Sequence, residues 1–600
     1  MRDVSAKVVP AHLRRFVVEQ DYDQYNAVDQ AVWRFVLLQT YGRLLETAHP
    51  TYRNGLAATG ISVDHIPRIS EMNERLSRFG WAAVCVDGFI PPRAFQEFQA
   101  HGILPIAADI RSRQHLAYTP APDIIHEAAG HAPILPDPVY ARFLRRIGEL
   151  GAQAFTVPEE DRVFQAIHDL SQVKEAPGCD AATVSRAEVE VHAAIASVHQ
   201  TSEAARLSRL YWWTAEYGLV GGADDYKIYG AGLLSSLGES HSCHHPSVRK
   251  IPLTAACMDV AYDITQTQPQ LFVASSFEEL HEVLDQAERQ LTRERGGGAA
   301  LQRAVNSRDV ASIRFSSGAW AIGTVRAAGP SMDRPAWLEF HGPVAFARGG
   351  KIHPAQKHLG AVMGQSLLLP TGRLAEGRDL GSLTDAELDA RGGEGAGEGN
   401  HRSGRVGDHH RFNFASGALV EGRLDRRVRD EAGRLMHVEL SNVVLSVPGR
   451  PPVALPHYAL LAAGELESAR AGAIDPSFYP ETDFGHQRVP RPRLLELSEQ
   501  RLLFLYRQAQ TAGAGAAAGA VWKSSDLRAV HDVLAGAYPQ EWLLRWNILE
   551  SLYKTGAPSE VTRPLYQELE HLEEVFQNRE PIASGLRYLS NQQIRNGGRG

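Results

Sequence analysis

The sequence has 600 residues, of which 44% are hydrophobic and 22% charged, and its formal net charge at pH 7 is −8. This composition is typical of a globular protein with several domains, and the scattered Lys and Arg residues exclude the clustered basic surface of a general nucleic-acid binder. Four cysteines without a CxxC pair exclude a disulfide framework. We therefore expect no nucleic-acid partner.

Membrane and secretion signals are also lacking in the sequence. No apolar run approaches the roughly 18 residues that a membrane span needs. The first residues contain no apolar core of signal-peptide length. These features predict a cytoplasmic protein without a membrane partner, and they leave its oligomeric state open.

Residues 1–292 are predicted to be mainly helical. Apolar residues recur at helical spacing in 31–47, 66–80 and 138–155. Ser276 and Glu279 have the spacing of a capping box, which predicts the start of a last helix there. The segment 293–300, RERGGGAA, is predicted to be a flexible linker.

Residues 301–488 alternate in hydrophobicity and turn on Gly and Pro, which predicts a β-rich region. FSSGAWAIG begins at Phe315 and FASGALVEG at Phe414, 99 residues later. WLEFHGPVAF and HVELSNVVLS begin at Trp337 and His437, 100 residues apart. A repeat at a fixed distance predicts an internal duplication of a small β unit.

Two further segments complete the chain. The Gly-rich stretch 391–410, between the two copies, is predicted to be disordered. Residues 489–600 are predicted to be helical, interrupted by the alanine–glycine tract 511–520. No catalytic constellation is recognisable after residue 300.

The most informative segment, HEAAGH, places His126 and His131 five positions apart. In the zinc-protease motif HExxH the histidines are four apart and share a helical face. Five positions correspond to a net rotation of about 140° on a straight α-helix, so the imidazoles would diverge. We predict that the helix bends or ends between them, which Gly130 permits. A zinc protease is therefore disfavoured.

A third ligand is expected from another element, and Glu216 in RLYWWTAEYGLV is the best candidate. It is an acid in a strongly apolar, aromatic helix, and buried carboxylates usually have a partner or a metal. Two histidines and one carboxylate leave coordination positions open, as Fe(II) oxygenases require. The alternative is a packed core His126 and an ion-paired Glu216. A rival zinc cluster in HSCHH (241–245) is disfavoured because its ligands are too close together, and an exposed polar loop is expected there.

Three segments in this order, PDIIHEAAGH, YWWTAEYGL and YGAGLLSSLGE, resemble the motifs of the pterin-dependent aromatic amino acid hydroxylases. Weaker similarity extends the resemblance over residues 10–292. It implies a mainly α catalytic domain over residues 1–292, of the kind found in long bacterial phenylalanine 4-monooxygenase-like members. It also implies Fe(II) and a tetrahydropterin as cofactors, and hydroxylation of an aromatic L-amino acid with O2, with phenylalanine to tyrosine as the first choice.

The resemblance also implies roles for single residues. His126, His131 and Glu216 are implied to hold iron, Arg111 the substrate carboxylate, and Asp123 the orientation of that arginine. The other implied substrate-binding residues are Thr119, Pro122, Trp212, Gly232 and Ser235. Phe95 is the implied stacking partner of the pterin, Glu127 the acid that faces the pterin, and Tyr211 a tyrosine near the iron, so that Glu127 and Tyr211 are the implied catalytic residues.

The sequence departs from the family pattern at one place that concerns the site. His131 and Glu216 are 85 residues apart, and the extra material around 157–206 is predicted to be an inserted helical excursion. Two other functions are considered. One is an inactive hydroxylase-like scaffold whose C-terminal half binds or regulates, and the other is an iron oxygenase that uses a 2-oxo acid. For residues 301–600 we expect a role either in subunit assembly or in gating the active site.

Overall fold

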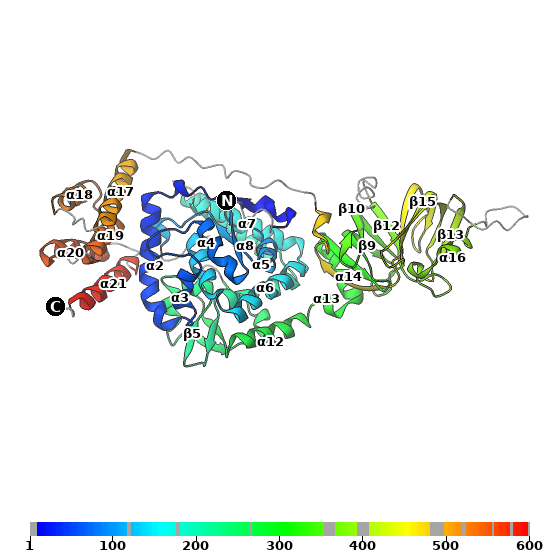
Figure 1. The fold of residues 1–600 in the computed structure, drawn as a ribbon, viewed down its shortest axis with the longest axis horizontal. Helices are drawn as coiled ribbons and strands as arrows, with labels where there is room; N and C mark the ends of the chain where they lie inside the picture. The colour runs from blue at the N-terminus through cyan, green and yellow to red at the C-terminus, as the bar shows by residue number, and fades with distance from the viewer. Residues whose placement is uncertain are drawn as a thin grey trace, which may run out of the picture.

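The computed structural model describes residues 9–116, 122–175, 180–263, 267–352, 366–392, 407–479, 497–517, 524–554, 557–575 and 580–597. Figure 1 shows three parts arranged along the long axis of the molecule. The N-terminal region (9–295) lies in the middle, the β module (297–479) at one end and the C-terminal helices (497–597) at the other. None of the described helices is both long enough and apolar enough to cross a membrane.

The N-terminal region is mainly helical, as predicted. Its α-helices are α2 (Ala27–Thr47), α3 (Tyr52–Ala58), α4 (Ile69–Leu76), α5 (Pro92–Ala100), α6 (Pro138–Gln153), α7 (Pro158–Glu175), α8 (Ala181–Ala196), α9 (Glu203–Tyr211), α10 (Ala231–Ser235), α11 (Glu239–Ser242), α12 (Phe277–Glu288) and α13 (Thr292–Arg295). Strands β1 (Val17–Val18), β2 (Ala82–Val86) and β3 (Ile103–Ala107) form one small sheet, and β5 (Tyr226–Ile228), β4 (Leu219–Gly221), β7 (Gln270–Ala274) and β6 (Arg249–Pro252) form another, in these orders.

The long helix α2 runs through the core of this region. It begins with a capping box, in which the Asn26 side chain accepts from the backbone N–H of Asp29 and the Asp29 side chain accepts from that of Asn26. Trp33, Phe35 and Val36 point to different sides of α2 and are all fully buried. This part of the helix therefore needs apolar packing partners on more than one side. The C-terminal helices provide some of these partners, and the rest of the N-terminal region provides the others.

Two local predictions for this region need correction. Helix α12 begins at Phe277, but the Ser276 side chain makes no capping hydrogen bond, and Glu279 instead accepts from the backbone N–H of Ser275. The predicted capping box is therefore wrong although the helix start is right. The flexible linker predicted at residues 293–300 is also wrong, because all of these residues except Gly296 lie in α13 or α14 (Gly297–Ser307) and Ala300 is fully buried.

The β module contains two antiparallel sheets. One has the order β11-β10-β9-β8-β17, with β12 paired to β10, and the other has the order β13-β14-β15-β16. The strands are β8 (Val310–Phe315), β9 (Ala319–Gly329), β10 (Trp337–Arg348), β11 (Lys351–Ile352), β12 (Ser366–Pro370), β13 (His409–Asn413), β14 (Leu419–Arg429), β15 (Leu435–Ser446), β16 (Val453–Leu461) and β17 (Leu466–Ala471), with one short helix, α16 (Asp385–Asp389).

Strand positions in the β module follow the repeat in the sequence. The meander β8-β9-β10 returns about one hundred residues later as β13-β14-β15, and both copies have irregular register between the second and third strands. Most of the predicted disordered stretch, 393–406, lies outside the described residues, but His409 and His410 belong to β13.

The β module has a hydrophobic core of its own. To this core the N-terminal region contributes a single buried side chain among the described residues, Phe155. Other contacts between these two parts include three polar pairs: Arg93 with Asp309, Arg470 Nη1 with Gln153 Oε1 at 3.2 Å, and Arg303 Nε with Glu203 Oε1 at 3.6 Å. The rings of His12 and Tyr479 also pack on each other there, with centroids 4.4 Å apart.

The C-terminal helices pack directly on α2. They are α17 (Leu497–Ala517), α18 (Ser524–Ala537), α19 (Trp542–Lys554), α20 (Ser559–Val575) and α21 (Glu580–Gly597). Phe35 of α2 meets Trp546 of α19 edge to face, with ring centroids 4.7 Å apart. Their buried side chains belong to the same continuous core as those of the N-terminal region. The predicted interruption at 511–520 is wrong for 511–517, which are helical; residues 518–520 lie outside the described residues.

Candidate metal centre and active site

His126 and His131 lie on a π-helix, η5 (Ile125–His131). Hydrogen bonds in a π-helix join residues five apart, so that positions i and i+5 follow one another on the same face. The two imidazoles accordingly face each other, with ring centroids 5.1 Å apart and planes at 85°. The predicted bend or end between the histidines is therefore wrong. A wider helical turn reconciles their spacing with a shared face.

Gly130 serves this helix through packing. A Cβ at position 130 would lie 2.6 Å from the carbonyl oxygen of Ala231 in α10, closer than real Cβ atoms come to any atom. Its φ is not in the left-handed region. Glycine therefore lets η5 and α10 approach each other, and α10 carries Ser235 to the back of His126.

Glu216 is the last residue of a second π-helix, η7 (Trp212–Glu216), which continues α9. Its Oε2 lies 3.3 Å from His126 Nε2 and its Oε1 lies 3.2 Å from His131 Nε2. The ligand atoms of the three side chains lie within 4.8 Å of one another, and no second group of this kind is found among the described residues. The structure thus brings the three predicted ligands together.

The electrostatics of this cluster favour a cation. Burial would raise the pKa of Glu216, but the neighbouring imidazoles His131 and His126 outweigh it and hold that pKa well below its usual range. Burial lowers the pKa of His126, yet the Glu216 carboxylate outweighs burial and raises it to about 9. The carboxylate therefore stabilises a positive charge between the rings, and a metal ion would supply that charge.

Hydrogen bonding orients the His126 ring. Ser235 Oγ donates to the Ala231 carbonyl at 2.8 Å and lies 3.0 Å from His126 Nδ1. Because the Ser235 hydroxyl donates its one proton to the Ala231 carbonyl, it can only accept a hydrogen bond from the His126 ring. The proton of His126 is then on Nδ1, and Nε2, which faces Glu216, presents a lone pair, as metal coordination requires.

His131 is fully buried, and neither of its ring nitrogens has a hydrogen-bond partner. An unsatisfied buried polar atom costs about 1–3 kcal/mol, so a native structure normally gives it a partner. A metal ion between His126, His131 and Glu216 would satisfy Nε2 of His131. The residues present therefore fit an iron ion.

A buried ion pair lies beside the cluster. Arg111 Nε and Nη2 donate to the two carboxylate oxygens of Asp123, both at 2.8 Å, and Asp123 Oδ1 also accepts from the backbone N–H of His126 at 3.0 Å. One edge of the Arg111 guanidinium is therefore occupied by Asp123. Its Nη1 and the second N–H of Nη2 form another edge that can bind a carboxylate.

Comparison with known proteins identifies this arrangement. A profile of the biopterin-dependent aromatic amino acid hydroxylases matches residues 22–167 and 182–296. The phenylalanine-4-hydroxylase of Mesorhizobium japonicum is 28% identical over 277 residues, covering 46% of this chain and 84% of that protein. That of Ralstonia nicotianae is 29% identical over 268 residues, covering 44% of this chain and 72% of that protein. Residues 22–296 belong to this family.

A solved structure of phenylalanine hydroxylase from Chromobacterium violaceum, with bound iron(III) and 7,8-dihydrobiopterin, is 26% identical; the likeness covers 48% of this chain and 94% of that one, with a TM-score of 0.36. By its match to the family profile, the N-terminal region is the domain of a pterin-dependent aromatic amino acid monooxygenase, a family that uses iron and a pterin, and the cluster of His126, His131 and Glu216 is its candidate metal site. We call this region the hydroxylase domain below. The two segments that match the family profile are separated by residues 168–181, a stretch that begins within α7 and ends at the first residue of α8.

On the substrate side of the hydroxylase domain, Trp212 is held between two tyrosines. Its ring stacks on Tyr262 at 4.2 Å and 8° and on Tyr217 at 4.6 Å and 27°. Tyr262 was not predicted, because it belongs to none of the three motifs. Trp213 is fully buried and donates from Nε1 to the Val260 carbonyl, as expected of a core residue.

The remaining predicted substrate-binding residues differ in their placement. Gly232 is buried in α10, where a Cβ would lie 2.9 Å from the Tyr217 ring. Pro122 is half-buried next to Asp123. Ser235 contacts the His126 ring, as described above. Thr119 lies outside the described residues.

On the other side of the cluster lie the residues predicted to meet the pterin. The half-buried Phe95 ring is 6.1 Å from both the His131 ring and the Tyr211 ring. Tyr211 receives a hydrogen bond from Gln99 Nε2 at 2.7 Å. Burial raises the pKa of Glu127 to about 7, against the opposing charge of His126 and His131. Phe95, Glu127 and Tyr211 thus all adjoin the metal cluster.

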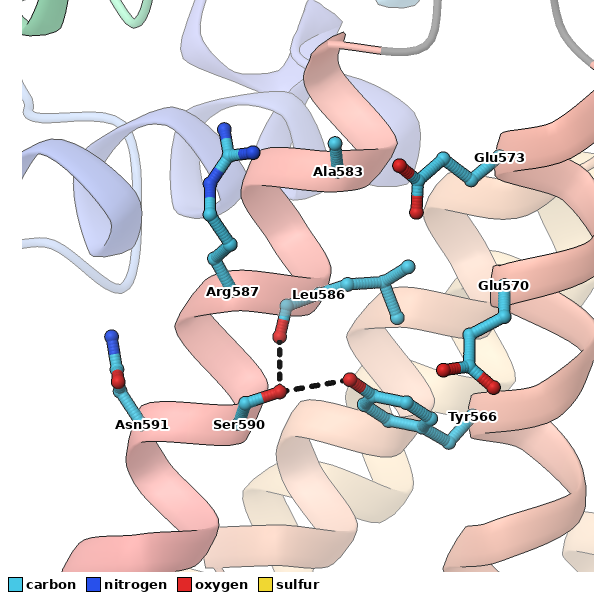
Figure 2. A pocket seen from close by; sticks show the side chains of 8 residues that line it. All are labelled: Tyr566, Glu570, Glu573, Ala583, Leu586, Arg587, Ser590 and Asn591. Carbon is cyan, nitrogen blue, oxygen red and sulfur yellow. Dashed lines mark hydrogen bonds between the residues drawn. The ribbon is translucent and has the colours of Figure 1, made fainter.

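Two other places carry no comparable chemistry. In HSCHH, Cys243 is buried and hydrogen-bonds the Ser240 carbonyl, while the His244 ring stacks on Tyr226. A surface hollow between α20 and α21 holds a Tyr566–Ser590 hydrogen bond of 2.8 Å beside Glu570 and Arg587 (Figure 2). This hollow belongs to the C-terminal helices and shares no residue with the metal cluster.

Proposed function

We propose that the protein hydroxylates L-phenylalanine to L-tyrosine with O2 and a tetrahydropterin, at an Fe(II) held by His126, His131 and Glu216. The observation that carries this proposal is the convergence of these three side chains, with both ring nitrogens of His131 otherwise unpartnered. The choice of phenylalanine is supported by the relatives, which are phenylalanine-4-hydroxylases matched over 84% and 72% of their own length.

Iron and the pterin supply the two-electron activation of O2, and the protein supplies geometry and a dry site. Glu216 would neutralise part of the cation's charge, and Ser235 would keep the lone pair of His126 directed at it. His126, His131 and Glu216 would hold the ion with three protein ligands, which would leave coordination positions for O2 and water.

Binding of the amino acid would depend on Arg111 and Trp212. The free edge of the Arg111 guanidinium would take the substrate carboxylate, while Asp123 holds the other edge in place. The aromatic side chain would lie against Trp212 and Pro122. Because Trp212 is fixed by stacking on Tyr217 and Tyr262, this wall is rigid before substrate binds.

The pterin would stack on Phe95, with Glu127 facing it. Glu127 is a buried carboxyl group whose oxygens can accept hydrogen bonds, which suits a residue that faces a ring with N–H groups. The buried Tyr211, held by Gln99, would close the space between Phe95 and His131.

The direct test is an assay of the chain loaded anaerobically with Fe(II), using phenylalanine, a tetrahydropterin and O2. Tyrosine is the expected product, and parallel reactions with tyrosine and tryptophan establish the preference. Absence of any hydroxylated amino acid would exclude the proposed function and would favour the inactive hydroxylase-like scaffold.

The metal ligands are tested separately by iron content. Glu216→Gln is expected to lower bound iron by at least about tenfold, because loss of an anionic ligand removes most of the charge complementarity. Glu203→Gln is the matched control, since Glu203 is a buried glutamate at the start of the same helix but contacts Arg303 instead. Equal iron content in both variants would remove Glu216 from the ligand set.

A further inference from the structure

The C-terminal helices reach the hydroxylase domain with two buried glutamates. Glu550 pairs with Arg34 of α2, with Nη2 and Oε2 2.9 Å apart, and its side chain is 2% exposed. Glu541 pairs with Arg113, and its side chain is 4% exposed. The first pair joins helix to helix, whereas the second reaches a loop.

Glu541 immediately precedes α19 and is hydrogen-bonded to two of the C-terminal helices. The Tyr506 hydroxyl donates to Oε1 at 2.7 Å, and the backbone N–H of Leu544, at the start of α19, lies 3.3 Å from the same oxygen. The other oxygen, Oε2, accepts from Arg113. Glu541 is thus buried and hydrogen-bonded through both oxygens, and its cationic partner Arg113 has a side chain that is 43% exposed.

Arg113 belongs to the turn that sets Arg111. It begins the short helix η4 (Arg113–His115), two residues after Arg111. On one side of this turn the Tyr25 hydroxyl donates to the Ala108 carbonyl at 2.7 Å, and on the other Leu116 is buried in the core. Arg113 is the point at which the C-terminal helices hold this turn.

We propose that Glu541 is a positioning residue for the amino acid substrate. By holding Arg113, it fixes the backbone that presents Arg111 to the substrate carboxylate, so that the C-terminal helices complete the substrate side of the active site. This inference rests on the proposed function of Arg111. It assigns a role in catalysis to a part of the chain that the family profile does not match.

Steady-state kinetics of full-length Glu541→Gln tests the inference. Its KM for phenylalanine is expected to rise about tenfold, the effect of losing one hydrogen bond between charged groups. The kcat at saturating phenylalanine and the KM for the pterin are expected to stay within about twofold, because neither the iron nor the Phe95 side is touched. Arg113→Gln should reproduce the effect.

Glu550→Gln is the matched control. Glu550 lies in α19, the helix that begins directly after Glu541, and is equally buried, but its partners are Arg34 of α2 and Lys554 of α19 and not Arg113. The KM of Glu550→Gln for phenylalanine is expected to equal that of the wild type. The double variant Arg113→Gln/Glu541→Gln should show no greater KM than either single variant, because one interaction is lost only once.

Hydrogen exchange gives a readout that does not depend on activity. Backbone amides of residues 109–116 are expected to exchange faster in Glu541→Gln than in Glu550→Gln or the wild type. If the wild type hydroxylates phenylalanine but Glu541→Gln keeps its KM and its exchange pattern, or if Glu550→Gln raises KM equally, the inference is wrong. If the wild type hydroxylates no amino acid, the proposed function has failed instead.

Discussion

The β module and the C-terminal helices both follow the hydroxylase domain in the chain, but they are joined to it in different ways. The β module has a separate core, to which the hydroxylase domain adds only Phe155 among the described residues, and its other contacts include polar pairs and the packing of Tyr479 on His12. The C-terminal helices share one core with the hydroxylase domain through α2. The comparison teaches that distance along the chain does not decide which part is integral to the catalytic fold.

The largest difference is expected between two deletions. Removing residues 497–600 would expose Phe35 and the rest of that face of α2, and a domain is stable by only about 5–15 kcal/mol, so we expect an insoluble or iron-free protein. Replacing residues 310–471 by a short glycine linker should leave the hydroxylase domain folded. The ends of that deletion lie together, since the Gly472 N–H donates to the Val310 carbonyl at 2.8 Å.

Soluble yield, iron content and thermal unfolding measure both deletions. Equal losses of soluble yield, iron content and thermal stability in the two deletions would show that the β module is as integral to the hydroxylase domain as the C-terminal helices are. That result would contradict the difference described above.

A smaller effect is expected from single core residues. Trp546→Ala removes the ring that packs on Phe35 and should lower the stability of the hydroxylase domain by about 3–5 kcal/mol. Phe340→Ala removes an equally buried ring from the β module and should cost a similar amount there. Iron release during denaturant unfolding is the probe. The denaturant concentration at which iron is released should fall in Trp546→Ala and stay unchanged in Phe340→Ala.

The smallest effect is expected at the polar contact between the hydroxylase domain and the β module. Asp309→Asn removes the partner of Arg93, and because Asp309 is 47% exposed the loss should be at most about 1 kcal/mol. Calorimetric unfolding of this variant should differ little from that of the wild type. A loss as large as that of Trp546→Ala would mean that this contact, and not only Phe155, holds the β module in place.

Motif residues made the site predictable from the sequence. His126, His131, Glu216 and the Arg111–Asp123 pair meet as expected, because residue type and spacing within a motif carry the geometry. The kind of helix was not predictable in this way. The spacing of the histidines shows that a straight α-helix fails, but a bend and a wider turn satisfy it equally well.

Contacts between distant segments were the other limit. Tyr262 stacks on Trp212 from a loop without a motif, so its sequence neighbourhood offered no signal. The docking of α19 on α2 had a signal in the sequence, because Trp33, Phe35 and Val36 place large apolar side chains on more than one side of α2. Such a pattern predicts that another segment packs on the helix, but it does not identify that segment.

The π-helix η5 has a consequence for how this centre could change. Deleting a single alanine, either Ala128 or Ala129, would shorten HEAAGH to HEAGH, which has the histidine spacing of a zinc-protease motif. With that residue gone the helix would return to the narrower α turn, and His131 would change its angular position by about 100° relative to every residue before the deletion. One in-frame codon therefore separates two coordination geometries, and the register of the backbone is as much a part of this centre as its ligands are.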